Sequence, residues 1–99
     1  MEAYIFDGTD LASRNLAAKQ RREILSRMKG QQKFVIDLRN VQSVSESFAD
    51  ELFGVMVLER GSKFVTSHVK IVNASDSVLR SIAIAIQRRS EQKKQESIH

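Results

Sequence analysis

The stretch that decides the fold is residues 34–54, which read FVIDLRNVQSVSESFADELFG. Its first five residues are aromatic, β-branched or aliphatic around one aspartate, a composition typical of a buried β-strand. Ser45 and Ser47 follow, and serine just before a periodic apolar segment is a favoured helix N-cap. The stretch therefore predicts a strand, a loop and a helix.

The same order of elements repeats on both sides of this stretch, with turn residues between the elements. The expected strands cover residues 3–6, 33–38 and 69–72, and the expected helices run from residue 9 or 10 to 29, from 45 or 47 up to Gly61, and from 73 or 75 onward. Residues 62–68 fit either a short strand or an irregular turn. Because a repeated strand and helix order with short loops gives parallel strand pairs, we expect an α/β fold. It is a small single domain with a mixed or mostly parallel sheet of three to four strands, covered by three helices.

Composition excludes several classes of protein. The chain has 99 residues, one domain's worth, and no cysteine, so it has no disulfide, thiolate metal site or cysteine nucleophile. Its apolar runs are far shorter than the roughly 20 residues of a membrane-spanning helix. The first residues do not resemble a secretion signal. We therefore expect a cytoplasmic domain without a membrane segment.

Residue types that carry catalysis are scarce. His68 and His99 are the two histidines, and the four glycines stand singly, so no glycine-rich phosphate loop is formed. We expect no metal, no cofactor and no catalytic residue, and hence no enzyme.

Charge is distributed unevenly along the chain. Residues 9–30 carry six basic and two acidic side chains, whereas residues 41–60 carry four acidic and one basic. Arg14 and Arg21 fall on the apolar arc of the first helix. Either their stems lie on the core edge while their heads snorkel into water or pair with a carboxylate, or they bind a partner's carboxylate or phosphate. The basic helix and tail also support an alternative function, a nucleic-acid-binding accessory, although the aromatic residues occupy core-like positions.

The second expected helix has two unlike faces. One face is apolar, and roughly opposite it lie Ser47, Asp50, Glu51 and Gly54. Glycine costs about 1 kcal/mol relative to alanine inside a helix, so either another backbone approaches Gly54 closely or the position merely tolerates glycine. We expect this second face to be the outer surface of the helix.

The segment 34–54, with Ser47-Phe-Ala-Asp-Glu51 as its most specific part, resembles the STAS-like domain family of uncharacterised function, a relative of the bacterial anti-sigma factor antagonists. The resemblance extends back to Ser13-Arg14 and forward to residues 69–73 and 85–89. It implies a STAS-like α/β domain over residues 1–89. Residues 90–99 are polar and are expected to form a disordered tail.

The resemblance also implies a function, docking onto a protein partner in bacterial partner-switching signalling. The implied partner is a serine kinase of the histidine-kinase-like ATPase type or a sigma-regulatory protein. In the antagonists a serine at the start of this helix receives a phosphoryl group, and here Glu46 occupies that position. Glu46 either mimics phosphoserine, or the domain is never phosphorylated, or Ser47 or Ser45 is the acceptor.

These observations predict a non-enzymatic regulatory or adaptor module. Its partner-binding residues are expected to be Ser47, Asp50, Glu51 and Gly54, with Arg14 holding the preceding loop or meeting the partner. On this hypothesis Asp50→Arg abolishes partner binding and leaves the fold intact.

Overall fold

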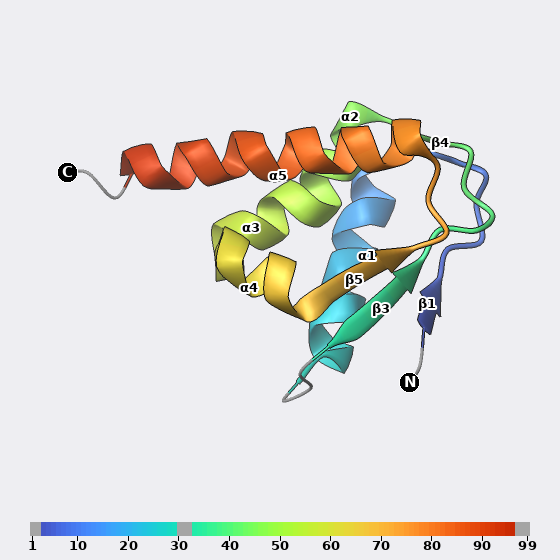
Figure 1. Ribbon diagram of the computed structural model, residues 1–99, viewed down its shortest axis with the longest axis horizontal. Coiled ribbons are helices and arrows are strands. Elements are labelled where there is room, and N and C mark those ends of the chain that lie inside the picture. The colour runs from blue at the N-terminus through green and yellow to red at the C-terminus, as the bar shows by residue number, and fades with distance from the viewer. Residues whose placement is uncertain (1–2, 30–32, 97–99) are drawn as a thin grey trace.

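The computed structural model describes residues 3–29 and 33–96. Its main sheet consists of β1 (Ala3–Ile5), β3 (Phe34–Asp37) and β5 (Val69–Val72), all parallel, in the order β1-β3-β5 (Figure 1). The three strands expected from the sequence are confirmed, and so is the α/β class. In the register of the sheet, Ile36 lies between Tyr4 and Ile71.

A second, smaller sheet corrects the expected start of the first helix. Residues Asp10–Leu11 form β2, which pairs in parallel with β4 (Ser43–Val44). The helix α1 therefore covers Arg14–Arg27 and is capped by Ser13, whose side chain accepts from Leu16 N. Thr9 and Asp10 do not cap it because this segment pairs with residues 42–45 instead, for example through Ser45 N–H to Leu11 O at 2.8 Å.

The second helix has the expected bounds but is less regular than expected. It is a continuous helix made of α2 (Glu46–Ala49), the π-helical turn η1 (Asp50–Gly54) and α3 (Val55–Arg60). Gly61, with φ at 92°, ends it. Residues 62–68 form neither strand nor turn but a further helix, α4 (Ser62–His68), because Val65 is buried there and Phe64 packs against the core. The described chain thus has four continuous helices, not three.

The last helix, α5 (Asp76–Glu96), lies across α2 and α3 (Figure 1). It continues through residues 90–96, where a disordered tail was expected; residues 97–99 lie outside the described residues. Lys93 Nζ donates to Leu58 O at 2.8 Å, which ties this part of α5 to α3. In the described ranges no helix is both long and apolar enough to cross a membrane.

One face of the main sheet carries the core. Phe34 and Ile36 are buried in a cluster with side chains from the helices, and Tyr4 and Ile71 pack against it. Strand side chains alternate between faces, so Ile5 and Lys70 lie on the opposite face and are exposed. The helical layer therefore covers one face of the sheet.

Candidate functional site

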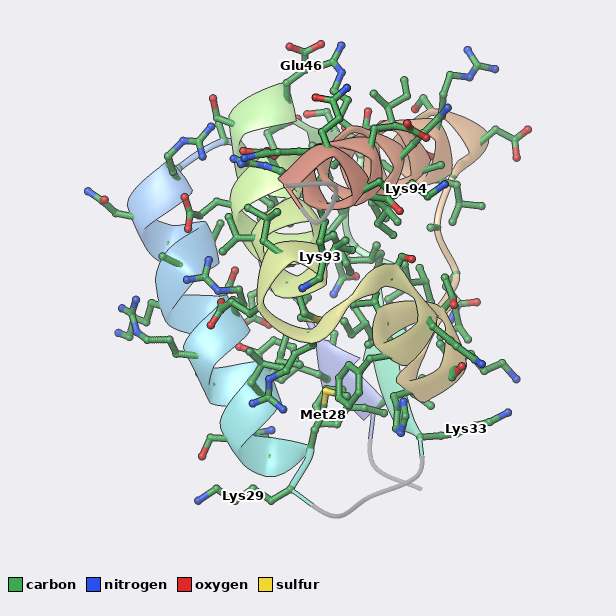
Figure 2. All side chains as sticks on the ribbon, turned by 90° about the vertical axis from the view of Figure 1, so that its left-hand side faces the viewer. Met28, Lys29, Lys33, Glu46, Lys93 and Lys94 are labelled. Atoms are coloured by element: carbon green, nitrogen blue, oxygen red, sulfur yellow. The ribbon has the colours of Figure 1, made fainter. Side chains whose placement is uncertain are left out.

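The π-helical turn is the most enclosed part of the second helix. Leu52, Phe53 and Gly54 are all buried. Val55 N–H donates to Asp50 O, as expected for a π-turn, and the Glu51 carbonyl accepts a hydrogen bond from Arg21 Nη1 at 2.5 Å. Helices α1 and α5 lie on either side of this turn (Figure 2). The face expected to be the outer surface of the helix is therefore largely covered by two other helices.

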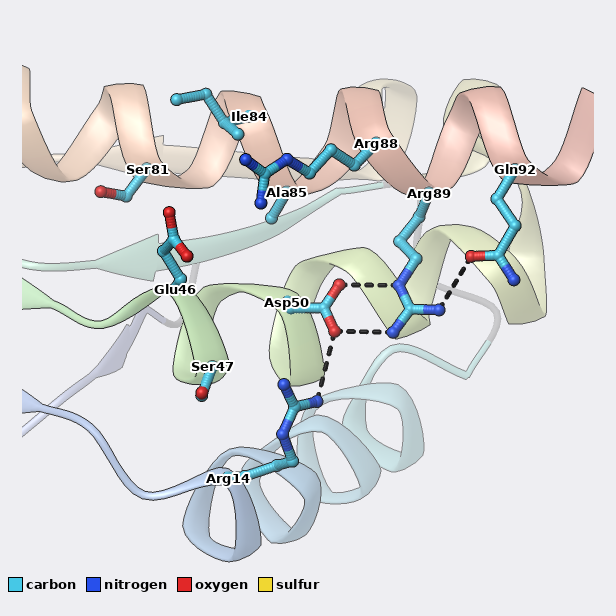
Figure 3. Close-up of a pocket in the computed structure, with 10 residues that line it drawn as sticks. All are labelled: Arg14, Glu46, Ser47, Asp50, Ser81, Ile84, Ala85, Arg88, Arg89 and Gln92. Atoms are coloured by element: carbon cyan, nitrogen blue, oxygen red, sulfur yellow. Dashed lines mark hydrogen bonds and ion pairs between the residues drawn. The ribbon is translucent and has the colours of Figure 1, made fainter.

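Asp50 is held between those two helices. Arg89 of α5 donates from Nε to Oδ1 at 2.7 Å and from Nη2 to Oδ2 at 2.6 Å, and Arg14 of α1 donates from Nη1 to Oδ2 at 3.2 Å (Figure 3). The hydrogen bonds from Arg89, and then those from Arg14, lower the pKa of Asp50 below its usual range. Asp50 is thus an ionised bridge within the fold, and its side chain, 23% exposed, is only partly open to a partner.

Glu51 has a similar environment on the α1 side. Arg14 Nη1 lies 3.0 Å from Oε1, and Arg21 Nη1 lies 2.6 Å from Oε2. Burial raises the pKa of Glu51, but the hydrogen bonds from the two arginines outweigh it and the pKa is lowered overall. Arg21 also pairs through Nε with Glu59 Oε1 at 3.0 Å. Of the two roles open to Arg14 and Arg21, the structure confirms pairing with carboxylates of the same chain.

Gly54 is needed because another helix approaches it. A Cβ atom at this position would lie 2.8 Å from Arg89 Cγ, 2.7 Å from Asp50 Oδ1 and 3.4 Å from Ala85 O. A close approach to Gly54 is therefore confirmed and comes from α5 of the same chain, but its short contact is the Arg89 side chain, while the nearest α5 backbone atom, Ala85 O, lies at ordinary contact distance.

The start of the helix remains accessible. Ser45 is the N-cap: its Oγ accepts from Phe48 N–H at 3.0 Å and donates to Ala12 O at 3.3 Å. Glu46 and Ser47 come next and are both exposed. Within the described residues the Ser47 hydroxyl makes no hydrogen bond, so it is the more accessible of the two serines proposed as phosphoacceptors.

A shallow pocket of about 300 Å³ adjoins this first turn. Its walls come from α1, the second helix and α5 (Figure 3). Its lining residues include Arg14, Glu46, Ser47, Ser81, Ile84 and Arg88. Glu46 and Arg88 are exposed on opposite sides of the pocket, so it offers both signs of charge. The structure thus brings four predicted residues together in the lining of one pocket, Arg14, Glu46, Ser47 and Asp50, while Glu51 and Gly54 lie outside that lining.

The α5 side of this pocket was missed in the sequence. Ser81, Ala85, Arg88 and Arg89 recur at helical spacing, but no periodicity indicates which helix such a face will meet. Ala85 and Gly54 lie close together because α5 packs against the second helix, and the sequence does not indicate this packing.

In the part of the chain that the structure describes, no three histidine, aspartate or glutamate side chains are grouped as metal ligands would be.

Comparisons with known proteins give one match. The sequence model of the family described as a STAS-like domain of unknown function matches residues 17–79, more than half of the chain. Neither the comparison with curated proteins nor that with solved structures gives a significant match. The matched residues include most of α1, β3, the second helix and β5, whereas β1 and the part of α5 that lines the pocket lie outside the match. The chain therefore belongs to the family of STAS-like domains of unknown function.

Proposed function

We propose that this domain is a non-enzymatic regulatory or adaptor module that binds a protein partner through the first turn of α2 and the pocket beside it. The observation that carries the proposal is the exposure of Glu46 and Ser47 next to a pocket walled by α1 and α5. An open, shallow surface with both signs of charge suits protein side chains better than a small substrate, which is usually enclosed on most sides.

The carboxylates near the pocket favour binding over catalysis. The pKa values of Asp50 and Glu51 are lowered by arginine hydrogen bonds, so both side chains stay ionised near neutral pH. A general acid or base works best with a pKa near the working pH. These carboxylates are suited to stabilising the fold under the docking surface.

The partner is expected to be a histidine-kinase-like ATPase with serine kinase activity or a sigma-regulatory protein, in bacterial cytoplasmic partner switching. Support comes from family membership and from the resemblance to anti-sigma factor antagonists. If such a kinase acts on this chain, Ser47 is the expected acceptor, because the Ser45 hydroxyl is used as the helix cap. A phosphate would add about −1.5 to −2 charge beside Arg14 and near Glu46, changing the charge of the docking surface.

The test is a pull-down with the tagged domain from its native cytoplasm after nuclease treatment, read by mass spectrometry. Specific capture of such a protein by the wild type, and its loss with Glu46→Lys and with Arg88→Glu, supports the proposal. Lys63→Glu, which reverses an exposed charge on α4, is the matched control, and this variant should still capture the same protein. Prey binding that survives both pocket variants contradicts the proposal.

Two further readouts use the same samples. Intact-mass analysis of the bait shows whether a phosphoryl group is added, and Ser47→Ala should remove it. A second pull-down omits the nuclease. Nucleic acid recovered with the wild type, but not with Arg22→Glu on the outer face of α1, would favour the nucleic-acid-binding alternative. That alternative is weakened by the pairing of Arg14 and Arg21 with carboxylates of the chain itself.

A further inference from the structure

We propose that a second surface, the groove along the outer edge of β1, binds an extended peptide segment of a partner protein that presents an apolar side chain flanked by basic ones. The groove has a volume of about 560 Å³ and lies between β1, the segment after it and the start of α1. Its lining residues include Tyr4, Ile5, Asp7, Asp10, Leu16 and Gln20. None of them lines the pocket at the start of α2.

The floor of the groove is unusually apolar for an exposed surface. Ile5 is 44% exposed and Leu16 is 42% exposed, and both line the groove. The other large hydrophobic side chains exposed to this extent in the described residues, Leu79 and Ile84, lie on α5. Grouped exposed apolar side chains mark interaction sites more often than single ones do. Covering either of these side chains with an apolar group of a partner would stabilise a complex.

The shape of the groove suits an extended chain. β1 is an edge strand of the main sheet because the strand order is β1-β3-β5. An edge strand presents main-chain N–H and C=O groups that an added strand can pair with, while alternate side chains of the added strand enter neighbouring pockets. The occupant is therefore a strand and not a helix.

The polar groups of the groove select the charge of the occupant. Asp7 and Asp10 are exposed at its rim, and none of the described residues that line it is basic. A peptide with lysine or arginine next to its apolar residue would complement this rim. Gln20 adds a hydrogen-bond acceptor, because its Oε1 atom is buried and accepts no hydrogen bond. An unpaired buried acceptor is costly, and rotation of the Gln20 amide toward the groove would let a peptide N–H satisfy it.

The test uses a display library of random twelve-residue peptides, selected in parallel on the wild-type domain and on Leu16→Glu. The expected result is enrichment, on the wild type alone, of sequences with an apolar residue flanked by lysine or arginine. One enriched peptide is then titrated into the isotope-labelled domain, where chemical-shift changes should concentrate on β1 amides and the Gln20 side chain.

Variants separate the groove from the rest of the surface. Ile5→Lys and Leu16→Glu should each lower the affinity for the peptide about tenfold or more, because each removes a buried aliphatic contact. Leu79→Glu, equally exposed at 41% but on α5, is the matched control and should leave affinity unchanged. Glu46→Lys should also leave it unchanged, so failure of this proposal and failure of the proposed function are distinguishable.

Three outcomes would overturn the proposal. The first is that no sequence is enriched on the wild type over Leu16→Glu. The second is that the enriched peptides are acidic or shift residues at the start of α2. The third is a concentration-dependent dimer of the free domain, seen by sedimentation and abolished by Leu16→Glu, which would assign the groove to a second copy of the chain.

Discussion

Arg89 binds both carboxylate oxygens of Asp50, through Nε at 2.7 Å and Nη2 at 2.6 Å, and so joins α5 to the π-helical turn of the second helix. Gly54, one helical turn beyond Asp50, makes this possible because the Arg89 Cγ atom lies only 2.8 Å from where its Cβ would be. Both side chains of the pair are about a quarter exposed, so the pair is only partly screened by water. The pair sits next to the proposed docking surface and determines where α5 lies.

Removing the arginine of this pair should destabilise the domain. Arg89→Met leaves Asp50 with Arg14 alone, at 3.2 Å, and hydrogen bonds to charged groups contribute about 1.5–3 kcal/mol each. We expect the free energy of unfolding, measured by urea denaturation, to fall by about 1–3 kcal/mol. The control is Arg88→Met, the exposed neighbour, for which no change is expected. Equal stability of the two variants would show that the pair does not anchor α5.

The same contacts change the meaning of an Asp50→Arg substitution. It would place a third guanidinium beside Arg14 and Arg89 and remove both ion pairs. We expect a lower melting temperature and reduced helical circular dichroism, so loss of partner binding in this variant would not identify an interface. Unchanged melting would contradict the structural role of Asp50.

Substituting Gly54 should test the close approach directly. Gly54→Ala gains up to about 1 kcal/mol of helix propensity, but its Cβ would lie 2.8 Å from Arg89 Cγ and overpacking costs about 1–3 kcal/mol. We expect a net loss of stability. An Arg89→Ala background lacks Cγ and also releases the Asp50 carboxylate, whose Oδ1 would otherwise lie 2.7 Å from the new Cβ, so the same substitution should there be neutral or stabilising. A double-mutant cycle without such coupling would contradict this account.

The sequence predicted the main strands well because their signals are local. Residues 34–37 and 69–72 are short apolar runs bounded by turn residues, and both form strands where expected. The pairing of β2 with β4 is different, since two-residue strands carry no period and depend on contacts between residues far apart in the chain. The sequence therefore predicts that the first helix begins at residue 9 or 10, which is earlier than its start at Arg14 in the structure.

The candidate site was predicted in part. Helical spacing placed Ser47, Asp50, Glu51 and Gly54 on one face, but which face meets solvent depends on where the other helices pack. Gly54 was the one local signal of close approach, and it did not identify α5 as the approaching element. A π-helical turn also cannot be read from a period of 3.6 residues.

The two serines at the start of the second helix should differ in their effects on stability. Ser45 accepts a hydrogen bond from Phe48 N–H at 3.0 Å, and loss of an N-cap serine costs about 0.5–2 kcal/mol. Ser45→Ala should lower the free energy of unfolding by that amount. Ser47→Ala should change it little, because Ser47 is exposed and does not cap the helix. Equal losses in both variants would contradict the assignment of Ser45 as the cap.

Acid should destabilise the domain through Asp37 at the end of β3. Its carboxylate is 2% exposed and accepts from Arg39 Nε at 2.9 Å, Asn73 Nδ2 at 3.1 Å and Arg39 N–H at 3.0 Å. These hydrogen bonds, chiefly from the Arg39 side chain, lower the pKa of Asp37 from 3.8 to about 2. The folded state thus binds the proton less readily than the unfolded state, so this contribution is complete above pH 3.8 and is lost as the pH falls toward about 2.

Arg39→Met should move that acid transition. Without the arginine side chain the pKa of Asp37 rises toward its ordinary value, so the stabilising contribution becomes smaller at neutral pH and disappears at a higher pH. A carboxyl-carbon NMR titration reads the pKa, and urea melts from pH 7 down to pH 2 read the stability. Arg22→Met, which removes an exposed arginine of α1, should leave both curves in place. If Asp37 titrates near 3.8 in the wild type, the carboxylate is not held by these donors, and the link it makes through Asn73 between the ends of β3 and β5 is weak.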